Sequence, residues 1–86
     1  MKVYQSRSFA QKVKKFSHTD KKELDSVIKN IIKNPDLGVE KKGDLKGVFV
    51  HKFDLHNHKY LLTYRLVEKQ NLELIVIGRM KTATLN

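Results

Sequence analysis

The spacing of apolar residues changes once along the chain, and this change limits the fold more than any other feature. Before the break at residues 34–43, which contains Pro35 and Gly38, apolar residues recur every three or four positions, as on one side of a helix. After Gly43 they alternate with polar residues, as in strands that have one buried face. The helices and strands are therefore predicted to occupy separate halves of the chain, which is typical of an α+β fold.

Two amphipathic helices are predicted before the break. The patterns Ser8-x-x-Gln11 and Asp20-x-x-Glu23 resemble capping boxes and place the helix starts near Ser8 and Asp20. The stretch 16–20 between them fits only a tight corner, so the helices should form an antiparallel hairpin. Their apolar positions are Phe9, Val13 and Phe16 in the first helix and Leu24, Val27, Ile28, Ile31 and Ile32 in the second.

Three β-rich runs follow the break, at residues 47–55, 59–67 and 72–78, and one short strand at 2–5 precedes the helices. The short polar turns between the runs require antiparallel neighbours. The predicted order is β-α-α-β-β-β, in a single domain over residues 1–86. A two-helix hairpin packs on one face of a small, mostly antiparallel sheet, and the other face stays at least partly open.

The composition is strongly basic. Its 86 residues include 18 Lys and Arg against 9 Asp and Glu, which gives a net charge of +9 and a pI near 9.9. This charge predicts attraction to phosphate backbones or to an acidic protein, although a lysine-rich surface that only solubilises the domain is the alternative. A chain with no cysteine excludes disulfides, thiolate zinc sites and a cysteine nucleophile. No run suits a signal peptide or a membrane span, so we expect a cytoplasmic location.

Four short motifs stand in a fixed order on the strand half: Leu45-Lys46-Gly47, Lys52-Phe-Asp-Leu55, Tyr60-Leu-Leu-Thr-Tyr64 and Ile75-Val-Ile-Gly78. Each is weak alone, but with the order of elements they resemble the RelE/ParE superfamily of type II toxin–antitoxin toxins over nearly the whole chain. The resemblance implies a toxin that an acidic antitoxin holds inactive. Such toxins either cleave messenger RNA on the ribosome without a metal, as RelE does, or poison DNA gyrase, as ParE does. We expect the acidic partner segment to cross the sheet and helix hairpin, along an apolar edge strand that ends at Ile77.

The resemblance also suggests catalytic residues. RNA cleavage by 2′-hydroxyl attack needs proton transfer and cations that stabilise the phosphorane. Lys52 matches the first catalytic lysine of RelE-like enzymes, and Arg79 matches the first member of a basic pair. Asp54 and Leu61 stand where those enzymes have a second lysine and a transition-state arginine. Alternation puts Arg65 on the same strand face as Leu61, from which it is a candidate to replace the missing arginine.

Histidines offer a second route to acid–base chemistry, because some nucleases of the superfamily use them and an imidazole titrates near neutral pH. His51 is the candidate among the three histidines at 51, 56 and 58. The alternative is that the polar segment 56–58 only forms a solvated turn. The His-x-His pair has no evident third ligand, so we expect no metal and no other cofactor.

Nucleic-acid or ribosome contacts are predicted for the cations of the strand half, which lie away from the helical lysines. We interpret the helical lysines mainly as a solvated face. Tyr60 and Tyr64 share a strand face with Leu62 and are predicted to be core residues rather than a base-stacking platform. The predicted contact residues are Lys46, Lys52, Arg65, Arg79 and Lys81.

The segment 78–86 departs from the resemblance. Many relatives with a similar third strand carry His, Tyr and Arg after the fourth, whereas this chain reads Gly78-Arg-Met-Lys-Thr-Ala-Thr-Leu-Asn86. If Arg79 is encoded by CGC, the bases of Met80 to Thr82 read His-Glu-Asn in the neighbouring frame. A frameshift and a natural divergence of the tail both stay open. The sequence predicts a RelE-like mRNA endoribonuclease, weakened or inactive through this tail; the alternatives are a gyrase inhibitor and a non-catalytic basic nucleic-acid-binding module.

Overall fold

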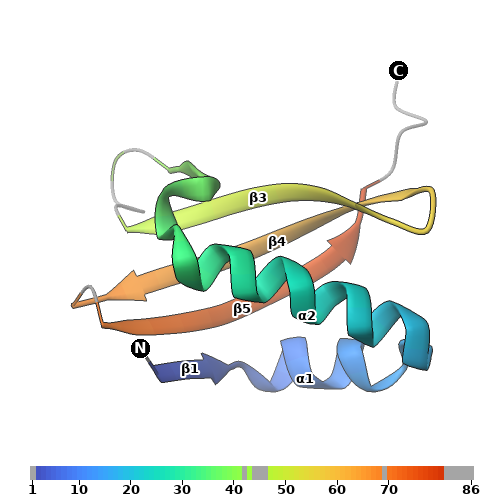
Figure 1. Cartoon of the computed structure of the whole chain (residues 1–86). Helices are drawn as coiled ribbons and strands as arrows, with labels where there is room; N and C mark the ends of the chain where they lie inside the picture. Colours follow the sequence, from blue (N-terminus) through green and yellow to red (C-terminus); the bar gives the residue numbers. More distant parts are fainter. Residues whose placement is uncertain (1, 42, 44–46, 69, 81–86) are drawn as a thin grey trace.

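The computed structural model describes residues 2–41, 43, 47–68 and 70–80 (Figure 1). The α+β class and the predicted β-α-α-β-β-β order are confirmed, with an additional short strand and a 3-10 turn in the segment that was predicted as a break. In chain order the elements are β1 (Lys2–Gln5), α1 (Arg7–Lys14), α2 (His18–Lys33), η1 (Pro35–Leu37), β2 (Val39–Glu40), β3 (Val48–Leu55), β4 (His58–Val67) and β5 (Asn71–Arg79).

The five strands form one sheet in the order β1-β5-β4-β3-β2. All neighbouring pairs are antiparallel except β1 and β5, which are parallel. The prediction of an edge strand ending at Ile77 is wrong, because β1 pairs in parallel with the first part of β5, from Asn71 to Leu74. The amides of Lys2 and Ser6 donate to the carbonyls of Gln70 and Leu74, at 3.1 and 2.9 Å. The edges of the sheet are therefore β1 and β2.

Both helices begin slightly earlier than predicted, at Arg7 and His18, because Ser6 and Ser17 supply the caps in place of Ser8 and Asp20. Ser6 Oγ accepts from the amide of Phe9 at 3.0 Å and donates to the carbonyl of Ile75 at 2.5 Å, which ties the start of α1 to β5. Ser17 Oγ accepts from the amide of Asp20 at 3.1 Å. Asp20 thus lies in the first turn of α2, where its negative charge interacts favourably with the helix dipole.

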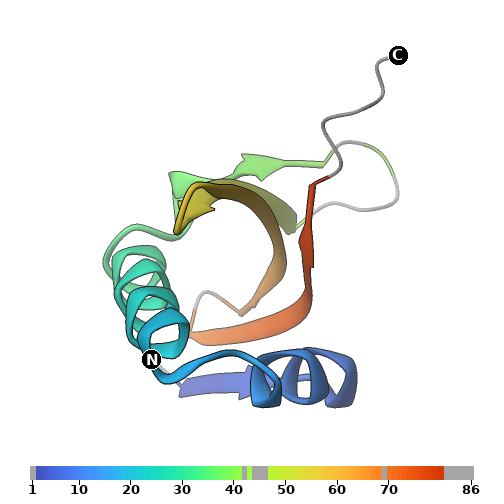
Figure 2. The same cartoon turned by 90° about the vertical axis from the view of Figure 1, so that its right-hand side faces the viewer.

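The sheet is curled, and α2 lies across the mouth of its concave side, while α1 follows β1 below β5 (Figures 1 and 2). We call the concave side the covered face and the opposite side the open face. Tyr64 is fully buried on the covered face, which confirms its predicted core role, whereas Tyr60 packs against the same core but is only half-buried. The buried core consists of Phe9, Leu24, Ile31, Phe49, Leu62, Tyr64, Leu72, Leu74 and Ile77.

Tyr64 connects the core to the segment that leads into β2. Its hydroxyl donates to the carbonyl of Pro35 at 2.6 Å and accepts from the amide of Gly38 at 3.0 Å. A Cβ atom at Gly38 would lie 2.9 Å from the carbonyl oxygen of Val50 and 3.0 Å from this hydroxyl, so glycine permits the close approach. Burial raises the pKa of Tyr64, and the Asp36 carboxylate raises it further, against the opposing effect of the Gly38 bond.

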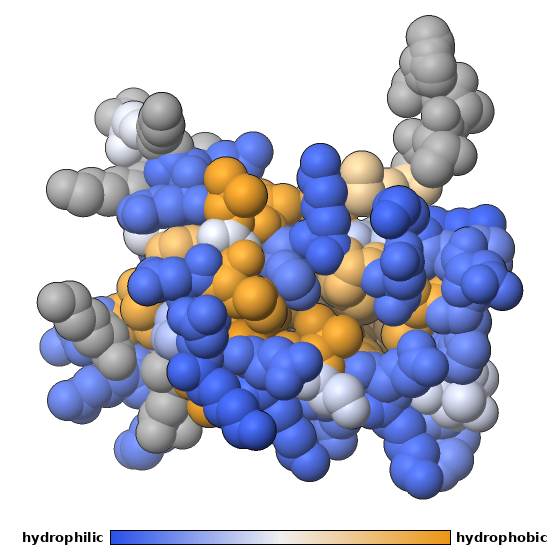
Figure 3. Space-filling model, turned by 45° about the horizontal axis from the view of Figure 1, so that its top comes forward, coloured by the Kyte–Doolittle hydropathy of each residue, from blue (hydrophilic) through white to orange (hydrophobic). Residues whose placement is uncertain are grey.

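The hairpin between β3 and β4 turns on His56 and Asn57, which have φ angles of 49° and 69°. Two consecutive positive φ angles are typical of a type I′ turn, whose twist matches that of the strands. Apolar side chains line the seam between α2 and β3, bordered by hydrophilic ones (Figure 3), and Leu37 and Val39 nearby are exposed. Neither α1 nor α2 nor any other described helix is long and apolar enough to span a membrane.

Candidate functional site

Side-chain alternation assigns each strand residue to one face of the sheet. On the open face, Lys52 of β3 lies directly across from Leu61 of β4, which in turn pairs with Gly78 of β5. Within the described part of the chain, Lys52 makes no ion pair. The open face carries Val48, Val50, Lys52, Asp54, Lys59, Leu61, Thr63, Arg65, Val67, Glu73, Val76 and Gly78.

The other charges of the open face are paired across strands. Arg65 donates from Nε and Nη2 to Glu73 Oε1, at 3.0 and 2.7 Å. Lys59 Nζ lies 3.2 Å from Asp54 Oδ1. Arg65 does share a face with Leu61, as the alternation predicted, but the two are four residues apart along β4, or roughly 13 Å. Arg65 is therefore both neutralised by Glu73 and displaced from the position next to Lys52.

The two remaining catalytic candidates lie on the covered face. His51 precedes Lys52 in the strand and points the opposite way, where its ring stacks on Phe53 with centroids 5.9 Å apart. Burial lowers the pKa of His51, which favours its neutral form. Arg79 pairs with Tyr60 in the sheet, and its Nη2 donates to His58 Nδ1 at 2.8 Å. The four candidates thus divide between two faces and do not form one centre; Lys46 and Lys81 lie outside the described residues.

Sequence reasoning missed a second group of cations. Lys12 and Lys15, interpreted above as part of a solvated helix face, line a pocket of about 310 Å³ together with Arg79. The pocket lies where the end of α1 meets the end of β5, and Phe16 and Tyr60 form part of its wall. The three-residue spacing of Lys12 and Lys15 was visible in the sequence, but the contribution of β5 to the same pocket was not.

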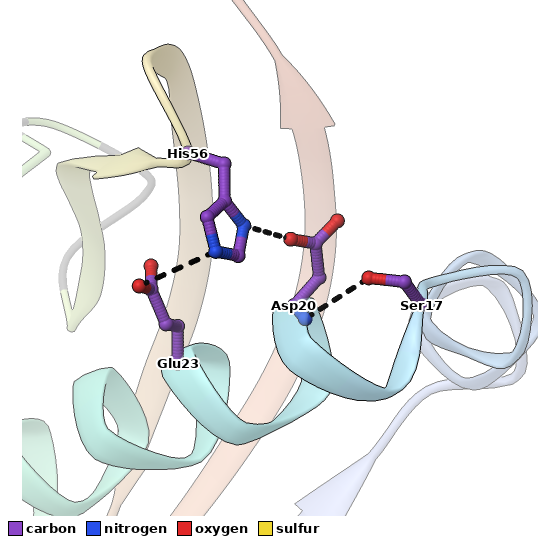
Figure 4. A network of polar contacts seen from close by, with 4 residues as sticks. All are labelled: Ser17, Asp20, Glu23 and His56. Atoms are coloured by element: carbon purple, nitrogen blue, oxygen red, sulfur yellow. Dashed lines mark hydrogen bonds and ion pairs between the residues drawn. The ribbon is translucent and has the colours of Figure 1, made fainter.

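Beside this pocket, a polar network connects the β3–β4 hairpin to α2 (Figure 4). His56 Nδ1 contacts the carboxylate of Asp20, and Nε2 lies 3.6 Å from Glu23 Oε1. The imidazole lies between the two carboxylates, which approach opposite sides of the ring, so the three groups do not converge on one point. Among the described residues no cluster of three potential metal ligands was found.

Comparisons with known proteins identify the family. Residues 3–82 match the family described as ParE-like toxin of type II bacterial toxin–antitoxin system. The chain belongs to this family. The predicted membership in the RelE/ParE superfamily is confirmed, and a search of curated protein sequences found no significant match to this ParE-like toxin.

Three solved structures resemble this toxin closely in fold and distantly in sequence. A chain of the intact E. coli RelBE toxin–antitoxin complex is 15% identical, with a TM-score of 0.72 over 93% of this chain and 96% of that one. The isolated E. coli RelE toxin is 14% identical, with a TM-score of 0.75 over 96% of this chain and 87% of that one. A mutant of E. coli RelE in complex with an antitoxin RelBc peptide is 14% identical, with a TM-score of 0.71 over 95% and 85%. At these identities the likeness shows the fold alone.

Proposed function

We propose that this toxin acts in the cytoplasm as a RelE-like endoribonuclease on ribosome-bound messenger RNA, and that its own cleavage activity is weak. The fold shared with E. coli RelE over nearly the whole length of both chains supports the RelE-like assignment. Within the site, the main support comes from Lys52. It is an open-face cation without an ion pair among the described residues, and it matches the first catalytic lysine that the resemblance to RelE-like enzymes implies.

The weak activity follows from what surrounds Lys52. Cleavage concentrates negative charge on the phosphorane, and a single missing stabilising group costs an enzyme about 10²- to 10³-fold in rate. Here the cross-strand neighbour of Lys52 is the uncharged Leu61, and Arg65 is held by Glu73. Neither His51 nor Arg79 replaces the missing charge, because both point to the covered face.

The decisive experiment adds the missing cation. In Leu61→Arg, a guanidinium would stand directly across from Lys52, and we expect cleavage of messenger RNA on translating ribosomes to rise at least tenfold over the wild-type chain, measured by mapping 5′ ends. Thr63→Arg is the matched control, because it lies on the same strand and face but opposite Val50. Lys52→Ala should abolish the gain. If Leu61→Arg and Thr63→Arg behave alike, the proposed centre is wrong.

A gyrase inhibitor is the alternative within the superfamily, and a non-catalytic nucleic-acid-binding module is the alternative outside it. Inhibition of DNA supercoiling by gyrase, without new messenger 5′ ends in any variant, would favour the first. Retention of ribosome or RNA binding with neither effect would favour the second. The same preparations serve all three assays, so the outcomes are directly comparable.

The partner is proposed to be an acidic antitoxin. A groove of about 680 Å³ runs between β1, α1 and α2, and its apolar floor includes Phe9, Leu24 and Ile28. Lys21, Lys22 and Lys29 line the groove and outnumber Asp25, which also lines it, so the groove suits an amphipathic segment with acidic flanks. Binding of the acidic product of a neighbouring gene should weaken with salt and in Lys29→Glu more than in Lys33→Glu, a residue of the same helix outside the groove.

A further inference from the structure

The pocket at the junction of α1, α2 and the ends of β4 and β5 combines positive charge with aromatic surface. Lys12 and Lys15 reach it from the end of α1, and Arg79 reaches it from the last residue of β5. All three are exposed. Residues from these distant parts of the chain therefore meet at one small concave site.

Cations outnumber acidic residues among the described residues that line this pocket. The segment from Arg7 to Lys15 contains no acidic residue. Asp20 is the acidic residue among the described residues that line the pocket, and its carboxylate is turned toward His56 (Figure 4). Ser17, the N-cap of α2, also lines the pocket, so the positive end of that helix dipole lies beside it. An anion entering the pocket therefore meets cations on two sides.

The aromatic wall adds a second kind of contact. Phe16 and Tyr60 meet edge to face with ring centroids 5.7 Å apart, and Tyr60 also stacks on Phe53 at 6.0 Å. Both pocket rings are only half-buried, which leaves ring surface available to a ligand. Cations together with a partly exposed aromatic ring are the usual means of binding single-stranded nucleic acid, because the phosphate and the base are held at once.

We propose that this pocket binds one nucleotide of single-stranded RNA, with its phosphate between Lys12, Lys15 and Arg79 and its base against the Phe16–Tyr60 wall. A duplex is disfavoured because its bases are stacked inside the helix and cannot enter a pocket of about 310 Å³. An acidic peptide would use the cations but not the aromatic wall. The choice of RNA rests on the proposed function, whereas the pocket itself rests on the geometry alone.

The test measures the binding of a short, fluorescently labelled single-stranded RNA to the isolated protein by anisotropy over a range of salt concentrations. In Lys12→Ala/Lys15→Ala we expect the slope of log K against log salt to decrease by about 1.4, or about 0.7 for each lost phosphate contact. Lys14→Ala/Lys33→Ala is the matched control, since it removes the same charge from the two helices but from outside the pocket. Its slope should change much less.

A second variant tests the aromatic wall. Tyr60→Leu should weaken RNA binding about 5- to 150-fold, the range for loss of one stacked base, whereas Tyr60→Phe should retain it. Circular dichroism checks that each variant folds, and amide NMR shifts on adding RNA should cluster at Phe16, Tyr60 and Arg79 rather than at Lys52.

The proposal is overturned if the pocket and control double variants lose equal affinity, or if a duplex or an acidic peptide shifts the pocket resonances and single-stranded RNA does not. None of these readouts requires cleavage. A chain that fails the ribosome assay above but binds RNA here would contradict the proposed function and support the pocket.

Discussion

Cations are paired with acidic residues to different extents on the two faces of the sheet. On the open face, Arg65 is paired with Glu73 and Lys59 with Asp54, so that among the described residues Lys52 is the one cation of this face without an ion pair. At the end of the covered face, Lys12, Lys15 and Arg79 surround a pocket whose acidic residue, Asp20, is bonded elsewhere. A net charge of +9 does not show which surface binds an anion. The ion pairs of each cation do show which surface suits an anion, because a cation that is neutralised by a carboxylate attracts phosphate only weakly.

The largest expected effect concerns the covered face. Tyr64→Phe would remove the hydroxyl that bonds Pro35 and Gly38, leaving a carbonyl and an amide of the segment before β2 without their partner. We expect a loss of about 1 to 3 kcal/mol in the free energy of unfolding, measured with urea. Tyr60→Phe is the matched control on the same strand and face, because the described residues show no hydrogen bond to its hydroxyl. Equal effects would show that the Tyr64 hydroxyl bonds do not stabilise the fold.

An intermediate effect is expected on the open face. Glu73→Gln would free Arg65 and thereby give the open face a second unpaired cation beside Lys52. Stability should change by about 0 to 1 kcal/mol, since both partners are well exposed. RNA affinity should rise, and the salt slope should steepen by up to about 0.7. Glu68→Gln is the control, because it changes the net charge equally without releasing an ion pair of the described residues. An equal rise in RNA affinity in this variant would show that the Arg65–Glu73 ion pair does not limit RNA binding.

The smallest effect concerns His51, whose pKa is lowered by burial from its ordinary value of 6.5. Below that value the unfolded chain binds a proton that the folded protein does not, so stability falls as the pH drops toward the folded pKa. His51→Gln removes this contribution. The variant should therefore gain stability relative to the wild type as the pH falls from about 7.5 to about 5.5, a window around the ordinary histidine pKa. His18→Gln controls for the loss of an exposed imidazole, and a difference independent of pH would contradict the assignment.

The sequence predicted correctly on which face of the sheet several candidate residues lie. Alternation correctly placed Leu61, Thr63 and Arg65 on one face and the two tyrosines on the other. The same rule already separated His51 from Lys52, because adjacent strand residues point to opposite sides, so these two belong to no common centre. The pairing of Arg65 with Glu73 was not predictable, since it depends on the register between β4 and β5, which includes a bulge near Thr63 and Tyr64.

Periodicity in the sequence was enough to predict the two α-helices, the strands other than β2, the α+β class and the burial of Tyr64, because it reflects which side chains are removed from water. The folded structure was needed to see that β1 pairs with β5, that Ser6 and Ser17 cap the helices, and that Lys12 and Lys15 meet Arg79. Most of these features depend on long-range contacts. Periodicity is a local property of a few neighbouring residues, whereas strand order, ion pairing and pocket composition depend on contacts between segments that lie far apart in the chain.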